Sequence, residues 1–292
     1  GTHPDLVWVQ PSGAAEMLVS DIDEPVVLAA TRTPFEAQRR VFVLEDADAM
    51  NDAAANRLLK TLEEPAPHAH LLLLSARPAE LLETIRSRCQ SVRFDALPAN
   101  ELARQLEAEG APAPLAAACS RLALGDGRLA RELVDGRLRA AAEALAQADG
   151  ERPWEPLLAI AAARGQEAAA QLAAAQAERL ELSGKSDRKR LEREHAERAK
   201  RAVRRAGARA LDKGLSICGL WFRDAAVLAD GAPELLYACD RGDQLARLAA
   251  QRSAPALRRA LECVEQTRHS LALNVSEELA LEALAYRLAE PA

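Results

Sequence analysis

Short apolar runs alternate with helical patterns over the first hundred residues. Candidate strands are Val41–Leu44, Leu71–Leu74 and Leu6–Val9, each with four consecutive apolar residues, and Ser91–Phe94, which mixes polar and apolar residues. Strands of this length separated by helices indicate βαβ units, whose right-handed crossovers make the strands parallel. We therefore predict a parallel sheet built from these four segments.

One amphipathic helix is predicted between the second and third strands. Asn51 or Asp52 is a suitable N-cap and Pro65 ends the helix. Its apolar face carries Leu58, Leu59 and Leu62.

Strand signals stop after Pro98, and the remaining chain has helical patterns. Helices are expected at Ala99–Glu109, Pro114–Leu124 and Arg128–Gln147, followed by a hinge at Gly150–Pro153. The last helix has one apolar face formed by Leu281, Leu284 and Leu288. These patterns predict a partial α/β domain over residues 1–98, a helical domain over 99–150 and an all-helical domain over 151–292.

Composition is that of a soluble globular protein rather than a membrane protein. Hydrophobic residues are 49% and charged residues 28% of the 292 residues, and no apolar run approaches the roughly 20 residues that span a bilayer. The five cysteines are scattered without a CxxC pair, which argues against a zinc site or a secreted disulfide framework and favours a reducing cytoplasm. The net charge of −6 excludes a global attraction to nucleic acid.

Lys185–Lys213 is the one strongly basic segment, with 12 Lys or Arg against five acidic residues. The i,i+4 pairs Glu194–Arg198 and Glu197–Arg201 favour a solvated, self-paired helix over a DNA-binding surface. At its start, Gly184-Lys185-Ser186 matches the end of a phosphate-binding loop. That loop requires a glycine where Arg179 stands, so we reject the match.

Polar side chains with possible chemistry follow two of the apolar runs. Glu45 and Asp46 come directly after Val41–Leu44, and Ser75 comes after Leu71–Leu74. Carboxylates at strand ends are suited to Mg²⁺ coordination and water activation. An acidic turn that caps the next helix explains Glu45 and Asp46 equally well. Arg88, in Ser87-Arg88-Cys89, is either a surface ion pair or an arginine that reaches a neighbour's γ-phosphate.

Taken together, these segments resemble a known family. NDAAANRLLKTLEEP at Asn51–Pro65 and TIRSRC at Thr84–Cys89 resemble clamp-loader subunits of the AAA+ superfamily, and fit best the delta-prime family of the bacterial DNA polymerase III loader. The resemblance continues in the HPD at His3–Asp5, GDGR at Gly125–Arg128, and Leu271–Leu284, and is weaker over Trp154–Leu271. The resemblance implies a partial AAA+ core with a parallel sheet, an all-α lid and an all-α C-terminal collar domain.

The same resemblance implies roles for individual residues. Glu45 and Asp46 take the Walker B positions in reversed order, which places Mg²⁺ handling in doubt because metal geometry is exacting. Ser75 takes the sensor-1 position and Arg128 the sensor-2 position. Arg88, flanked by Ser87 and Cys89 of the SRC motif, takes the position of an arginine finger acting in trans.

The resemblance also implies cofactors and partners. ATP and Mg²⁺ would bind in the neighbouring subunit and not in this chain, while the family's phosphate-binding loop and zinc module lie upstream of its HPD. We expect the sheet to lack one strand and to expose an unpaired edge. The implied partners are the gamma/tau ATPase and delta subunits, the sliding clamp and, through the complex, primer-template DNA, all in the bacterial cytoplasm and without a membrane.

Three functions remain open from the sequence. The first is a non-hydrolysing or weakly hydrolysing clamp-loader subunit of the polymerase complex that supplies Arg88 to a neighbour. The second is an ATP-hydrolysing motor subunit whose phosphate-binding loop lies upstream. The third is a helical nucleic-acid-binding protein that uses residues 185–213.

Overall fold

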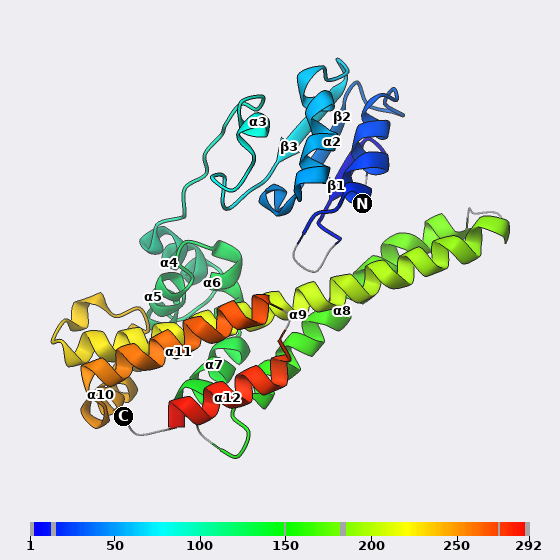
Figure 1. Cartoon of the computed structure of the whole chain (residues 1–292). Coiled ribbons are helices and arrows are strands. Elements are labelled where there is room, and N and C mark those ends of the chain that lie inside the picture. The colour runs from blue at the N-terminus through cyan, green and yellow to red at the C-terminus, as the bar shows by residue number, and fades with distance from the viewer. Residues whose placement is uncertain (1–2, 13–15, 149, 182–184, 274, 290–292) are drawn as a thin grey trace. The chain divides into compact units, whose positions relative to one another are not determined.

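A computed structural model describes residues 3–12, 16–148, 150–181, 185–273 and 275–289 (Figure 1). The chain divides into two compact units. The first contains residues 1–93 and 171–205, and the second contains residues 94–170 and 206–292.

The first unit is built on a three-stranded parallel sheet. Its strands are β1 (Leu6–Val9), β2 (Arg40–Leu44) and β3 (Ala69–Leu73), in the order β1-β2-β3. Val9 is in register with Leu44, and Leu44 with Leu73, so all three carboxyl ends lie along one edge. Three of the four predicted strands and their parallel direction are confirmed.

The predicted fourth strand is wrong. Residues 90–98 contain neither helix nor strand, and Val92 and Phe94 are 68% and 88% exposed. The alternation of polar and apolar residues in Ser91–Phe94 resembles a strand, but a strand also needs a neighbour for its backbone N–H and C=O groups. Within the described residues, no strand pairs with this segment.

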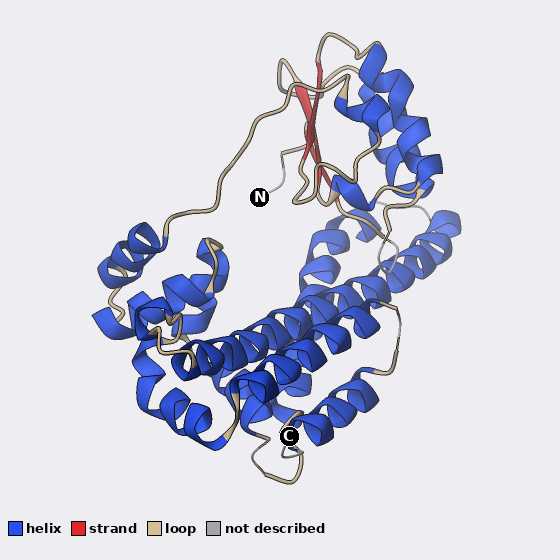
Figure 2. Cartoon of the chain, turned by 60° about the vertical axis from the view of Figure 1, so that its left-hand side comes forward, coloured by secondary structure: helices blue, strands red, loops and turns tan. Residues whose placement is uncertain are grey.

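Helices cover one face of the sheet, as the edge-on view of the strands in Figure 2 shows. They are α1 (Val19–Ile22), a π-helical stretch over Asp23–Leu28, and α2 (Asp52–Glu63). As predicted, Asn51 caps α2, and its side-chain oxygen accepts the N–H of Ala54 at 2.9 Å. Phe42, Leu44 and Leu58 are fully buried between the sheet and these helices.

The opposite face of the sheet is partly exposed within the described residues, although Val43 at its centre is buried. Trp8 and Leu72 flank Val43 in the sheet register and are 56% and 51% exposed. Parallel sheets are normally covered on both faces, so this apolar surface is unusual for the strand arrangement.

A buried carboxylate shapes the loop before β2. Asp5 is 2% exposed and accepts the backbone N–H groups of Phe35, Glu36 and Ala37 at 2.6–2.8 Å. The hydrogen bond from Ala37 contributes most to lowering the pKa of Asp5 to about 2; burial opposes the shift, and the other two N–H groups support it.

Asp5 should make this loop sensitive to acid. Because the folded pKa lies below the unfolded one, the stabilisation is complete above about pH 4 and disappears as the pH falls toward about 2. We expect Asp5→Asn to remove most of the hydrogen-exchange protection of the Phe35–Ala37 amides at neutral pH and to abolish its acid dependence. NMR-detected exchange measures both effects, with Glu36→Gln as the exposed control. Equal protection in Asp5→Asn and wild type would contradict this role.

The second unit is entirely helical among its described residues. Its helices are α4 (Ala99–Ala108), α5 (Ala113–Leu122), α6 (Gly127–Val134), α7 (Arg137–Gln147), the first part of α8 (Glu155–Glu181), the last part of α9 (Lys185–Ala229), α10 (Gly242–Gln251), α11 (Ala254–Ala272) and α12 (Glu277–Ala289). The predicted helix Arg128–Gln147 is in fact two helices. Gly136 has φ +82°, a left-handed conformation that ends α6 and that glycine adopts without strain.

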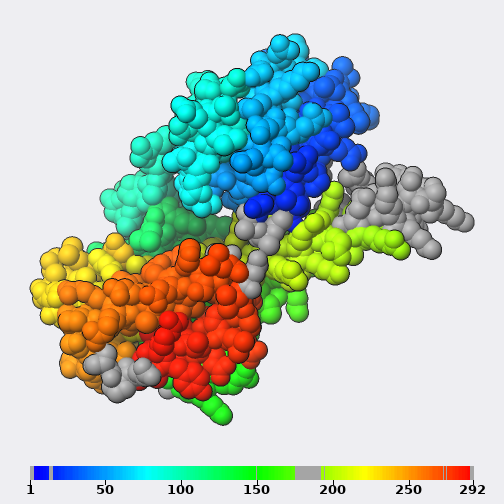
Figure 3. Space-filling model, viewed as in Figure 1, coloured from blue at the N-terminus to red at the C-terminus, as the bar shows by residue number. Residues whose placement is uncertain are grey.

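One hydrophobic core runs through the second unit. It contains residues of α4 to α7 as well as of α8 to α12, including Leu102, Leu145, Leu157 and Phe222. The predicted apolar face of α12 is confirmed, with Leu281, Leu284 and Leu288 at most 1% exposed. Helix α12 packs on α11, and both are orange to red in Figure 3. The predicted division at residue 150 stays a prediction.

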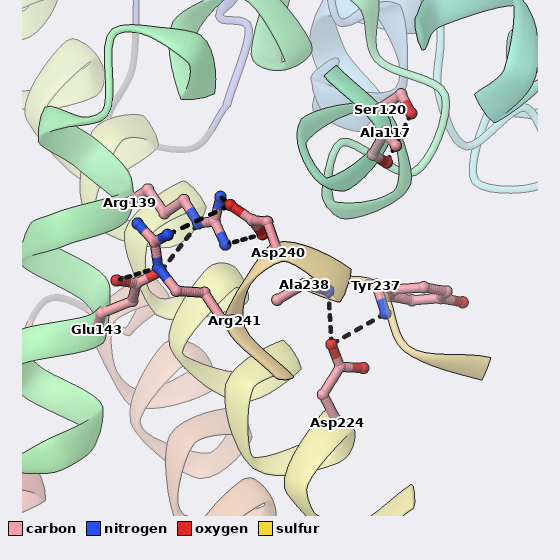
Figure 4. A network of polar contacts seen from close by, with 9 residues as sticks. All are labelled: Ala117, Ser120, Arg139, Glu143, Asp224, Tyr237, Ala238, Asp240 and Arg241. Carbon is pink, nitrogen blue, oxygen red and sulfur yellow. Dashed lines mark hydrogen bonds and ion pairs between the residues drawn. The ribbon is translucent and has the colours of Figure 1, made fainter. Parts of the chain in front are cut away.

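A buried ion network joins α7 to the segment before α10 (Figure 4). Arg139, whose side chain is 3% exposed, donates two parallel hydrogen bonds to Asp240 at 2.7 and 2.8 Å and a third to Glu143 at 2.8 Å. Asp224, which is fully buried, accepts the backbone N–H groups of Tyr237 and Ala238 nearby.

None of the helices in the described part of the chain is both long and apolar enough to cross a membrane.

Candidate functional site

The acidic turn after β2 lies beside the end of β3, as expected from the sheet. The N–H of Leu74 donates to Leu44 O at 2.9 Å, and the N–H of Ala47 donates to Leu74 O at 2.8 Å. Glu45, Asp46 and Ser75 therefore follow neighbouring strands at one edge.

The side chain of Glu45 is directed to β1 and its extension. Its Oε2 accepts hydrogen bonds from Trp8 Nε1 at 3.0 Å and from Gln10 Nε2 at 2.6 Å. These contacts orient the carboxylate toward two neutral donors on the adjacent strand. Asp46 has φ +52°, a left-handed conformation that an aspartate tolerates and that turns the chain sharply after β2.

The hydroxyl of Ser75 pairs with Asp48, a residue that the sequence analysis did not select. Ser75 Oγ donates to Asp48 Oδ1 at 2.6 Å. Arg77 donates through Nε and Nη2 to Asp48 Oδ2 at 3.1 and 2.9 Å, and its other end reaches Glu80. The Asp48 side chain is only 5% exposed, so Ser75 and Arg77 together compensate a nearly buried charge. The sequence offered one signal for the role of Asp48: it is the third acidic residue in the turn Glu45–Asp48.

A small cavity lies beside this network. Asp48, Asp52 and Glu80 line it together with apolar residues of α2 and α3 (Glu83–Arg86), including Ala55 and the buried Ile85. Its volume is about 50 Å³, far below the roughly 300–1,000 Å³ of typical ligand pockets. Three carboxylates and this volume do not fit a nucleotide.

Arg88 follows α3 in the first unit and is exposed. Its Nε and Nη2 donate to Glu63 Oε1 at 2.9 and 2.6 Å, and its Nη1 donates to Thr84 O at 2.8 Å. Ser87 Oγ lies 3.3 Å from the same Nη1. The Arg88 side chain is 34% exposed. Burial raises the pKa of the adjacent Cys89 thiol, which keeps that thiol protonated and unreactive at neutral pH.

Arg128 belongs to the second unit and is exposed in the first turn of α6. Asp126 caps that helix by accepting the backbone N–H groups of Arg128 and Leu129 at 2.8 and 2.9 Å. The structure thus brings Glu45, Asp46 and Ser75 to one sheet edge, while Arg88 and Arg128 lie on other elements. The roles assigned to these residues stay predictions.

The basic segment is helical where it is described. Glu197 pairs with Lys200 at 3.0 Å, and that contact lowers the pKa of Glu197. Gly184 lies outside the described residues, and Lys185 and Ser186 begin α9. The Glu194 side chain also lies outside the described part. Among the described residues, no cluster of three or more His, Cys, Asp or Glu side chains has the arrangement of a metal site, and the five cysteines are unpaired.

The first third of the chain is similar to known proteins. Residues 1–98 match the family model described as DNA polymerase III, delta subunit. The DNA polymerase III subunit delta′ of Pseudomonas aeruginosa is 45% identical over 89 residues, which are 30% of this chain and 27% of that protein. Over residues 1–98, the chain is similar to the delta-prime subunits of DNA polymerase III.

The similarity extends further in a related subunit. The DNA polymerase III subunit tau of Escherichia coli is 31% identical over 196 residues, which cover 56% of this chain and 30% of that protein. A DNA polymerase III gamma subunit-related protein from Thermotoga maritima has a TM-score of 0.48 and 18% identity over 99% of this chain and 84% of its own. The chain thus spans less than a third of the length of these delta-prime and tau relatives.

Residues 1–98, which match the family model, contain the acidic turn, the Ser75–Asp48–Arg77 network and Arg88. Arg128 lies outside it. The segment that matches the family model therefore contains Arg88 and the acidic edge of the sheet.

Proposed function

We propose that this chain is a subunit of a bacterial DNA polymerase III clamp loader that donates Arg88 to ATP bound by a neighbouring subunit. The proposal rests on one observation above all. Arg88 lies in the segment that matches the family model, and its partly exposed guanidinium contacts Glu63 at the end of α2. A surface guanidinium can stabilise phosphoryl-transfer charge in trans without a nucleotide bound to its own chain.

The state of the chain's own sheet edge supports a non-hydrolysing or weakly hydrolysing role. Glu45 is hydrogen-bonded by Trp8 and Gln10, and Ser75 is hydrogen-bonded to Asp48. A Walker B carboxylate that handles Mg²⁺ must face the metal with little freedom in geometry. In this proposal ATP and Mg²⁺ belong to the neighbour, and no step of hydrolysis is assigned to Glu45, Asp46 or Ser75.

The partners follow from the same proposal. The neighbouring ATPase is of the gamma/tau class, a delta subunit completes the complex, and the complex acts on a sliding clamp and primer-template DNA. The helices after residue 150 serve as the oligomerisation domain in this account, and Arg128 and the basic segment 185–213 have no assigned contact with DNA.

Reconstitution tests membership in the complex. The purified chain, mixed with gamma/tau-class and delta subunits, is expected to form a stoichiometric assembly that native mass spectrometry detects and that loads clamps onto primed DNA. A mixture that omits the chain provides the control. Assembly and loading at equal yield without the chain would overturn the proposal.

The similarity to tau favours a second candidate, an ATP-hydrolysing motor subunit. Equilibrium binding of a fluorescent ATP analogue to the full-length protein distinguishes the two, because the phosphate-binding loop of a motor subunit would lie before Gly1. The leading proposal expects no saturable binding that competes with ATP, whereas a motor subunit would bind and then hydrolyse it.

A further inference from the structure

Glu63 occupies the side of the Arg88 guanidinium that a phosphate would need. A single carboxylate oxygen, Oε1, lies 2.9 Å from Nε and 2.6 Å from Nη2. With Thr84 O and Ser87 Oγ at Nη1, all three guanidinium nitrogens have an acceptor within the same chain. An arginine that clamps a phosphate uses two parallel N–H groups, so it has to give up some of these contacts.

The conformation of the Arg88 side chain is consistent with competition between these acceptors and a phosphate. Thr84 lies four residues before Arg88, so the hydrogen bond to Thr84 O folds the side chain back along its own segment. Glu63 is the last residue of α2 and reaches Arg88 from a neighbouring element. Both contacts direct the guanidinium toward its own chain, whereas a finger that acts in trans must extend away from it.

We propose that Glu63 holds Arg88 in a withdrawn position and that a nucleotide on the neighbouring subunit must displace Glu63 to engage the finger. This inference rests on the proposed trans role of Arg88. Glu63 is then a positioning residue that sets how readily Arg88 becomes available. Because the two side chains are 34% and 47% exposed, the restraint is weak, about two- to fivefold in availability.

Chemical modification of the free chain tests the restraint without ATP. Phenylglyoxal modifies accessible arginine side chains, and peptide mass spectrometry gives the rate at each site. We expect Glu63→Gln to increase the rate at Arg88 by about two- to fivefold, while the exposed Arg86 on the same peptide keeps its rate. Glu64→Gln removes the same charge from the adjacent exposed residue and should leave Arg88 unchanged. An unchanged Arg88 rate in Glu63→Gln would overturn the restraint.

ATP turnover by the assembled loader tests the functional consequence of the restraint that Glu63 places on Arg88. At limiting ATP, Glu63→Gln should increase turnover by about two- to fivefold, Glu64→Gln should match wild type, and Glu63→Gln/Arg88→Ala should match Arg88→Ala. Lower turnover in Glu63→Gln would mean that Glu63 supports the active position, and would overturn the proposal. If Arg88→Ala alone had no effect on turnover, the trans role would fail, and this failure is distinguishable because the modification rates are measured independently.

Discussion

Replacing Arg88 with alanine is expected to lower ATP turnover by the assembled loader by about 10³-fold, the size of effect that an arginine supplied in trans produces elsewhere. The loss should appear in kcat, because the guanidinium acts on charge that develops in the transition state. Assembly should be unaffected, since the ion pair that Arg88 makes with Glu63 is partly exposed and contributes little to folding.

Two variants sharpen this experiment. Arg86→Ala removes an exposed arginine two residues away, after which the same assembly should keep its wild-type turnover. Arg88→Lys retains the charge but loses the planar fork, so turnover should recover only partly. Wild-type turnover in Arg88→Ala, measured in an assembly that native mass spectrometry shows to be complete, would rule out the trans role.

The largest expected effect on stability is at Arg139. Removing its side chain leaves Asp240 and Glu143 as nearly buried carboxylates, 10% and 12% exposed, without their principal partner. We expect Arg139→Ala to lower the free energy of unfolding of the second unit by about 3–5 kcal/mol. Denaturant titration measures this loss through the fluorescence of Trp154 and Trp221, which are both buried in that unit.

The control for Arg139 lies two residues earlier. Arg137 pairs with Asp135, but its side chain is 79% exposed, and Arg137→Ala should cost no more than about 1 kcal/mol. The double variant Arg139→Leu/Asp240→Leu should be more stable than Arg139→Ala, because it removes the buried charge together with its partner. Equal unfolding free energies for Arg139→Ala and Arg137→Ala would show that the network does not stabilise the unit.

Elements whose signals are local could be predicted from the sequence. Val41–Leu44 and Leu71–Leu74 are continuous apolar runs that suit buried parallel strands, and Asn51 and Pro65 delimit α2 through cap and backbone chemistry. Ser91–Phe94 has a strand-like alternation, but its pairing depends on a neighbour that its own residues do not specify. The break at Gly136 was readable in principle, since glycine commonly ends a helix, yet an isolated glycine within a helical pattern is also tolerated.

The site was predictable as a set of positions and not as a set of contacts. Strand ends in a parallel sheet share an edge, so the proximity of the acidic turn to Ser75 followed from the fold. Which acid the serine hydroxyl meets depends on the left-handed turn at Asp46, which brings Asp48 to Ser75. The ion pair between Glu63 and Arg88 joins residues 25 positions apart, and it arises from the packing of α2 beside α3, which periodicity does not reveal.

The trans role of Arg88 is tested most directly by the affinity of the assembled loader for ADP with Mg²⁺ and aluminium fluoride, an analogue of the phosphoryl-transfer transition state. Such analogues report the interactions that a finger makes in the transition state. The account predicts that the loader with the wild-type chain binds the analogue about 10²–10³-fold more tightly than the loader with Arg88→Ala, while the two bind ADP alone equally. Equal affinity of both loaders for the analogue would contradict it.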